Sequence, residues 1–161
     1  MTTIVSSRPA VRTTGLRARP MPYRVFQVLY ALFTVQFAVL GVSYLADPDR
    51  AVHTFSTWNQ RLGGVPLLPP DVPPWRYATA VGMTTLALMC LMALLDLRRN
   101  HPVVVPAAFF KAYNAVLWFW YADHRMPVFF AAGVLDAVEV VVMVVVAAAA
   151  YRSLRVEEPA P

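Results

Sequence analysis

Three ionisable residues stand in stretches of sequence that are otherwise apolar. Lys111 lies in "FFKAYNAVLWFW", and Asp136 and Glu139 lie in "VLDAVEVVV". Two carboxyl groups three residues apart share one face of a helix, and an ammonium group opposite them can form an ion pair, hold a small ligand or exchange a proton. These three residues therefore indicate either a structural ion pair or a functional site.

The spacing of these residues around one short turn predicts which of them meet. The turn "ADHRM" predicts an antiparallel helical hairpin centred near His124. Lys111 lies 13 residues before that centre, whereas Asp136 and Glu139 lie 12 and 15 residues after it. At roughly 1.5 Å per residue, Lys111 and Asp136 reach the same depth and Glu139 lies somewhat deeper. We therefore expect a Lys111–Asp136 ion pair with Glu139 beside it.

Energetics favour pairing, but the charges do not balance. A charged side chain at the centre of a membrane span costs roughly 2.5–3.5 kcal/mol, so an unpaired one is unfavourable. One lysine faces two acids, so either one acid carries a proton or a further cation is present. Because the count brings Asp136 closer to Lys111, Glu139 is the expected protonated member.

Further polar residues are expected around this charged centre. Asn114 and Trp118 share a helix face with Lys111, while Gln36 and Thr85 (next to Thr84) lie near the middle of two other apolar stretches. All four stretches could thus contribute to one polar layer. The candidate ligand or proton site comprises Lys111, Asp136, Glu139, Asn114, Gln36, Thr85 and Trp118. The alternative is an ion pair that only sets helix register, and no motif indicates a catalytic residue, a metal site or a cofactor.

Composition determines the expected fold class. Of 161 residues, 58% are hydrophobic and only 14% are charged, and the mean hydropathy is +0.52. A soluble chain of this length cannot bury so much apolar surface, whereas a bilayer takes about 20 apolar residues per helical span. We predict an all-α, four-span transmembrane helical bundle forming a single domain over residues 22–152. The expected spans are residues 25–45, 75–95, 103–121 and 127–151.

The ends of the chain and the distribution of arginine predict its orientation. Residues 1–21 are expected to be a disordered basic cytoplasmic tail and residues 153–161 a short polar cytoplasmic tail. Arginines near the span ends favour both termini in the cytoplasm, in a multi-pass protein of a bacterial inner membrane. A basic tail followed at once by apolar sequence is topogenic, so nucleic acid is not expected as a partner. The lone Cys90 excludes an internal disulfide.

The connection between the first two spans has a helix signal of its own. Asp47 can cap a helix that begins at Pro48, and Gly63 and Gly64 can end it. The apolar residues of this helix that recur at helical spacing are Val52, Phe55, Trp58 and Leu62. This pattern predicts an amphipathic helix that lies on the outer membrane surface or over the mouth of the bundle. It either seals the bundle or acts as a gating lid.

Short fragments and the overall layout resemble a known family. A first span ending in "YLADP", an outer connection containing "RLGG", and polar third and fourth spans resemble small four-helix DoxX-like bacterial membrane proteins. The resemblance covers residues 25–151 and implies no defined reaction. The buried acids and tryptophans also resemble sterol-isomerase-like EXPERA bundles, but this chain has no histidine inside a predicted span.

These observations predict a role without enzymatic activity. The chain is expected to be an accessory or scaffold subunit, with an intramembrane binding or transport site for a lipid, quinone, cationic solute or proton as the alternative. An intramembrane isomerase is the third hypothesis. The expected partners are the lipid bilayer, another copy of the chain or a larger membrane complex, and a lipid-like or small cationic ligand.

Overall fold

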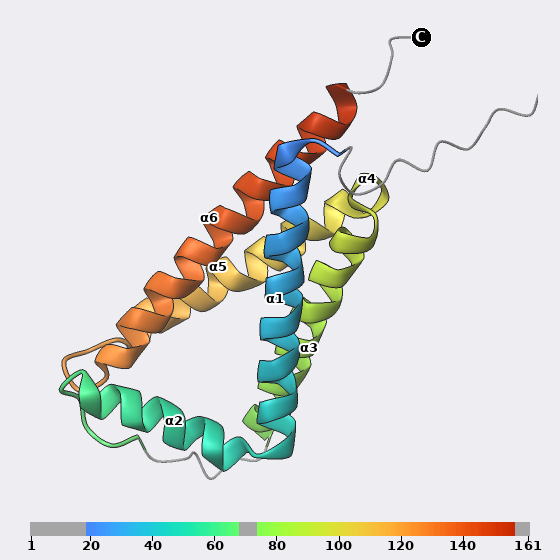
Figure 1. The fold of residues 1–161 in the computed structure, drawn as a ribbon. Coiled ribbons are helices and arrows are strands. Elements are labelled where there is room, and N and C mark those ends of the chain that lie inside the picture. Colours follow the sequence, from blue (N-terminus) through green and yellow to red (C-terminus); the bar gives the residue numbers. More distant parts are fainter. Residues whose placement is uncertain (1–18, 68–73, 157–161) are drawn as a thin grey trace, which may run out of the picture.

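All regular structure in the described residues is helical. The computed structural model describes residues 19–67 and 74–156 and contains no strand within those ranges. Figure 1 shows two long antiparallel helix pairs joined at one end by a helix that runs across them. In chain order the elements are α1 (Met21–Ala46), α2 (Pro48–Arg61), α3 (Pro74–Leu95), α4 (Leu97–Asn100), the 3-10 turn η2 (His101–Val103), α5 (Val104–Tyr121) and α6 (Pro127–Val156).

Prolines and aspartates mark where these helices begin. Pro48 and Pro127 each occupy the first position of a helix, where the missing N–H breaks no hydrogen bond. Asp96 caps α4 by accepting a hydrogen bond from the Arg99 N–H at 3.1 Å. In the turn before α6, Asp123 Oδ1 accepts from the N–H groups of Arg125 and Met126 at 2.7 and 2.9 Å. The short turn therefore holds α5 and α6 in a fixed antiparallel register.

Four helices are long and apolar enough to cross a membrane. These are Met21–Ala46, Tyr77–Leu95, Leu97–Tyr121 and Pro127–Val156. The third candidate joins α4, η2 and α5 into one stretch of 25 residues, whereas α5 alone has 18. The 26 residues of α1 extend about 39 Å at 1.5 Å per residue, and a hydrocarbon core is about 30 Å thick. By length and composition, the chain is a multi-pass membrane protein of the helical type.

The helix boundaries lie close to those predicted, and the largest differences are at the start of the first helix and the end of the last one. The first helix begins at Met21, four residues before the expected Val25, and α6 continues to Val156, five residues beyond the expected Tyr151. Residues 153–156, expected in a polar tail, are thus helical, and Ser153 and Arg155 bond back to the preceding turn. Of the predicted tail at residues 1–21, residues 1–18 lie outside the described residues, as do the last five residues, whereas Met21 already belongs to α1.

The core is formed where α1 packs against both α3 and α6. The largest fully buried side chains there include Phe26, Tyr30 and Phe37 of α1 and Met143 of α6. The Tyr30 hydroxyl donates a hydrogen bond to the Met143 carbonyl oxygen at 3.1 Å. Helix α5 packs against α6 on the other side. In this way α6 connects the α1–α3 pair to α5 (Figure 1).

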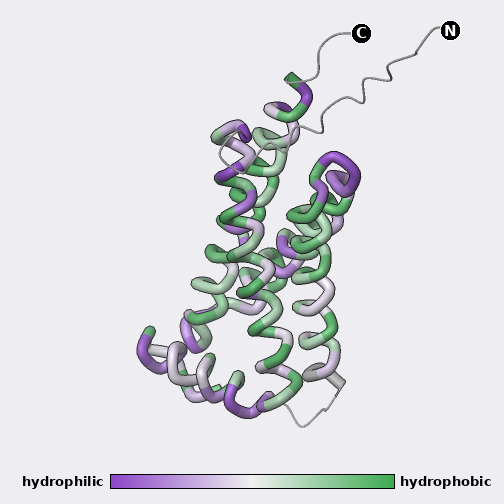
Figure 2. The backbone as a smooth tube through the Cα atoms, turned by 45° about the vertical axis from the view of Figure 1, so that its right-hand side comes forward, coloured by the Kyte–Doolittle hydropathy of each residue, from purple (hydrophilic) through white to green (hydrophobic). Residues whose placement is uncertain are grey.

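Apolar side chains also cover the outside of the long helices. On α1, Val28, Leu32, Val35 and Val39 are each about three-fifths exposed, and they recur every three or four residues. Figure 2 shows hydrophobic residues along the full length of the long helices and hydrophilic residues gathered near the ends and on α2. A soluble monomer rarely exposes so large a continuous apolar surface, which supports contact with lipid.

A glycine sets the distance between α1 and α3. A Cβ placed on Gly41 would lie 2.7 Å from Thr84 Oγ1 and 3.2 Å from the Thr84 backbone nitrogen. Small residues at such points allow two helix backbones to approach closely. Thr84 therefore lies at a helix–helix contact and not in a polar layer.

The connecting helix α2 is held by polar residues. Its predicted start is confirmed, because Asp47 Oδ1 accepts from the Arg50 N–H at 3.1 Å, and the chain turns at Gly63 with a φ of +87°. The buried residues of α2, however, are Ser56 and Asn59. Trp58 and Leu62, which recur at helical spacing with Val52 and Phe55, are each about half exposed. The predicted place of this apolar face on the membrane surface stays a prediction, and within the described residues hydrogen bonds hold the end of α2.

Asn59 makes these hydrogen bonds. Its side chain is fully buried, and its Nδ2 donates to the carbonyl oxygens of Val65 and Arg125, both at 2.8 Å. Its Oδ1 accepts from the Val128 N–H at 3.0 Å. Asn59 thereby satisfies an N–H of the first turn of α6, which has no partner within its own helix. The Asn59 side chain thus links the end of α2 to the turn between α5 and α6 by hydrogen bonds.

Candidate functional site: a charged centre shared by three helices

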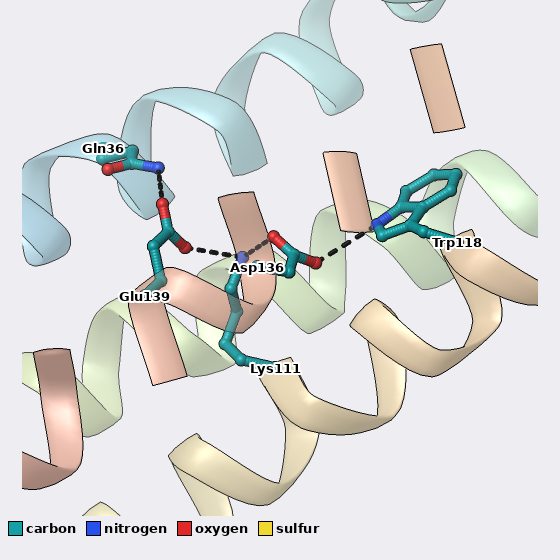
Figure 3. A network of polar contacts seen from close by, with 5 residues as sticks. All are labelled: Gln36, Lys111, Trp118, Asp136 and Glu139. Carbon is teal, nitrogen blue, oxygen red and sulfur yellow. Dashed lines mark hydrogen bonds and ion pairs between the residues drawn. The ribbon is translucent and has the colours of Figure 1, made fainter. Parts of the chain in front are cut away.

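Lys111 lies at the middle of the charged centre. It projects from α5 toward α6 and is only 3% exposed. Its Nζ donates a hydrogen bond to Asp136 Oδ1, and it lies 2.7 Å from Glu139 Oε2 (Figure 3). The predicted Lys111–Asp136 ion pair is confirmed, and the hairpin count placed both residues at the correct depth. Glu139 was expected beside this pair, and it reaches the same ammonium group.

Asp136 has a second partner on α5. Its Oδ2 accepts a hydrogen bond from the indole N–H of Trp118 at 3.1 Å. The spacing of Lys111 and Trp118, seven residues apart, places both on one face of α5, so one carboxylate of α6 contacts both. Asp136 is 9% exposed, and both of its oxygens accept a hydrogen bond, as a buried carboxylate requires.

Glu139 carries the interaction across to α1. Its Oε1 accepts a hydrogen bond from Gln36 Nε2 at 2.7 Å, while Oε2 meets Lys111 as an ion pair without a directed hydrogen bond. Gln36 is exposed on the outer side of α1, and Glu139 is partly buried. The polar contacts therefore run from the exposed Gln36 of α1 to the partly buried Trp118 of α5 (Figure 3).

Two aromatic rings lie against the charged centre, those of Phe37 and Trp118. Lys111 Nζ lies 5.1 Å from the centroid of the Phe37 ring, within reach of a cation–π interaction. Trp118 contacts the rings of Phe55 and Phe129, with centroids 6.1 and 5.1 Å away. Through Phe55, the connecting helix α2 touches the residue that binds Asp136. Trp118 is thus a hydrogen-bond donor to the charged centre as well as an aromatic residue near the end of a helix.

Two of the predicted site residues lie apart from this group. Asn114 is partly buried on α5, and Thr85 is exposed on α3. Within residues 19–67 and 74–156, neither makes a hydrogen bond to Lys111, Asp136 or Glu139. The charged centre therefore joins α1, α5 and α6, and no hydrogen bond or ion pair links Lys111, Asp136 or Glu139 to a described residue of α3.

Neither Phe37, which lies beside Lys111, nor Asn59, which holds the end of α2, was among the predicted residues. Phe37 follows Gln36 directly, but consecutive residues of a helix do not share a face, so the sequence carried no signal that this ring would lie beside Lys111. An asparagine on a short surface-like helix gives no signal either. Two of its three partners lie 66 and 69 residues further along the chain.

The arrangement supports helix association more directly than chemical reaction. An ammonium group between two carboxylates can hold helices together, bind a small polar ligand or take part in proton exchange. No cluster of three or more histidine, cysteine, aspartate or glutamate residues that could hold a metal ion occurs in the part of the chain that the structure describes.

Comparison with known proteins gives no match. No family model, curated protein or solved structure matches the chain. The DoxX-like resemblance therefore depends on the sequence fragments alone and stays a prediction.

Proposed function

We propose that this chain is a non-enzymatic accessory or scaffold subunit of a membrane, in which the charged centre fixes how α1, α5 and α6 meet. The observation that carries the proposal is the continuous set of contacts from Gln36 through Glu139, Lys111 and Asp136 to Trp118. It joins residues up to 103 positions apart and places every charge against a partner. Such a group favours one helix arrangement over others, since a wrong register would leave a charge unpaired.

Exchange of the two paired charges tests this role. Lys111→Asp and Asp136→Lys should each lower the amount of protein in the membrane, because each leaves like charges facing one another. The double variant restores opposite signs and should recover abundance and association with any partner together. Recovery of abundance without recovery of the partner would contradict the scaffold role, and failure to recover either would contradict the structural role of the pair.

A second candidate function is an intramembrane site for a proton or a lipid-like or cationic ligand. The observation that favours it is the excess of acids: Lys111 faces both Asp136 and Glu139, and Gln36 leads from Glu139 to an exposed edge. In this case Glu139→Gln should keep the fold and remove a carboxylic acid C=O band from the infrared spectrum of the wild type. An unchanged spectrum would exclude a protonated Glu139.

The proposed placement in the membrane has both termini on the cytoplasmic side. The start of α1 and the end of α6 lie at the same end of the molecule (Figure 1). The arginines near that end are Arg19, Arg24, Arg98, Arg99, Arg152 and Arg155, against Arg50, Arg61, Arg76 and Arg125 near the other end. This bias supports the cytoplasmic assignment, with α2 on the opposite membrane surface.

Labelling of single cysteines tests this orientation. In a Cys90→Ala background, a membrane-impermeant maleimide added to intact cells should label Arg61→Cys on α2 and not Arg99→Cys on α4. The reverse pattern would invert the orientation. Labelling of both sites only after the cells are broken would place α2 inside the cell as well.

A further inference from the structure

A hollow at the junction of α1 and α2 is separate from the charged centre. Its volume is about 530 Å³, within the range of roughly 300–1,000 Å³ that is usual for small-molecule sites. The lining residues that carry the argument are Leu40, Val42, Asp47, Arg50, Thr54 and Phe55. One side of the hollow is therefore apolar, and the other carries one acid and one base.

The two charged residues of the hollow do not neutralise each other. Asp47 Oδ1 accepts the Arg50 backbone N–H at 3.1 Å, and this hydrogen bond leaves the guanidinium group unused. Among the residues that the structure describes, no ion pair involves the side chain of Asp47 or Arg50. The Thr54 hydroxyl donates to the Arg50 carbonyl oxygen at 2.8 Å, so its proton is used in a hydrogen bond within α2. The hollow thus offers one negative and one positive group, with no net charge.

The apolar side of the hollow continues into the face of α1 that is exposed to lipid. Leu40 and Val42 belong to the last turns of α1, and Val39 and Val35 follow on the exposed surface toward the middle of that helix. Phe55 closes the other side and stacks on Trp118. At the end of a membrane span, such a hollow lies at the level of lipid head groups. Its occupant should therefore be an amphiphile with its polar head toward α2.

We infer that the hollow binds a zwitterionic phospholipid whose head group carries an ethanolamine ammonium. Arg50 pairs with the phosphate, Asp47 accepts from the ammonium, and the acyl chains follow Leu40 and Val42 along α1. An anionic lipid satisfies only Arg50, and its excess negative charge faces Asp47. This inference rests on the proposed membrane placement but goes beyond the proposed scaffold role.

Competition between two lipids tests the inference. The purified full chain in detergent receives equal amounts of dioleoyl phosphatidylethanolamine and dioleoyl phosphatidylglycerol, and native mass spectrometry counts each bound lipid. We expect the ethanolamine lipid to be preferred roughly two- to five-fold, the range of one partly exposed ion pair. Asparagine caps helices as well as aspartate does, so Asp47→Asn keeps α2 and should remove that preference.

Two further variants separate the head-group contacts from general charge. Arg50→Gln should weaken binding of both lipids, because both carry a phosphate. Arg61→Gln is the matched control, since Arg61 lies on the same helix over the Trp58 ring and does not line the hollow. It should leave binding unchanged. Equal binding of the two lipids by the wild type, an unchanged preference in Asp47→Asn, or an equal effect of the two arginine variants would overturn the inference.

Failure of this inference can be distinguished from failure of the proposed function. Extraction of the chain from membranes by alkaline carbonate would contradict the membrane placement itself. A chain that resists extraction and recovers in the charge exchange of Lys111 and Asp136, yet shows no lipid preference, would contradict the lipid site alone.

Discussion

Removal of the Lys111 charge should destabilise the protein far more than removal of either acid. At an effective dielectric constant of about 20, unit charges 2.7 Å apart, as Lys111 and Glu139 are, attract by about 6 kcal/mol. Desolvation offsets much of that attraction while the partners remain, but it is left uncompensated when one partner is lost. Lys111→Met leaves two facing carboxyl groups, so we expect a loss of about 3–5 kcal/mol in the free energy of unfolding.

The other members of the centre provide a graded comparison. Glu139→Gln removes the surplus acid and keeps an acceptor for Gln36, so its effect should stay within about 1 kcal/mol. The triple variant Lys111→Met, Asp136→Asn, Glu139→Gln carries no charge and should recover most of the loss, because a neutral group of similar volume avoids the desolvation cost. Asn114→Ala is the control on α5, expected within about 0.5 kcal/mol.

Equilibrium unfolding in mixed detergent micelles measures these differences. Helix content by circular dichroism is followed as sodium dodecyl sulfate replaces a mild detergent, and each variant is compared at the same protein concentration. A Lys111→Met variant within 1 kcal/mol of the wild type would refute the reasoning. So would a triple variant as unstable as Lys111→Met, because the cost would then come from packing and not from charge.

Three other changes test the contacts outside the charged centre. Asn59→Ala should cost about 1–3 kcal/mol and speed hydrogen exchange in α2, because it removes the partner of the Val128 N–H and of the Val65 carbonyl oxygen and leaves the Arg125 carbonyl oxygen with one hydrogen bond in place of two; the exposed neighbour Gln60→Ala should change neither. Gly41→Val should cost about 1–3 kcal/mol in the same unfolding assay, because its side chain meets Thr84 of α3, and an effect no larger than that of the exposed Val42→Ala would contradict the close approach. Tyr30→Phe should cost about 1 kcal/mol by loss of the hydrogen bond to the Met143 carbonyl, and an unchanged midpoint would show that this bond adds no net stability.

The sequence predicted the helices and one ion pair because those depend on local information. Apolar runs mark the long helices, and a five-residue turn fixes the register of α5 against α6, so Lys111 could be matched to Asp136 by counting. Hydrogen bonds within a helix and short turns do not depend on distant parts of the chain. The boundaries were therefore correct to within a few residues.

Contacts between helices distant in sequence could not be read in the same way. The long helices are apolar on all sides, so no polar face shows that α1 meets α6 or that Gln36 reaches Glu139 across 103 residues. The same ambiguity led to the expectation that threonines of α3 join a polar layer, whereas Thr84 contacts Gly41. On α2, the apolar spacing of Trp58 and Leu62 gave no sign that Asn59 would be buried and make three hydrogen bonds.

Helix α6 is synthesised last, so the residues that it contacts wait for their partners during translation. Tyr30, Gln36 and Lys111 all precede α6 in the chain, and their partners Met143, Glu139 and Asp136 all lie on it. Until the ribosome has delivered that last helix, the lysine has no carboxylate and the first helix lacks its final neighbour. A nascent chain halted before Pro127 would therefore expose an uncompensated cation, the kind of defect by which membrane quality control can distinguish an unfinished molecule from a complete one.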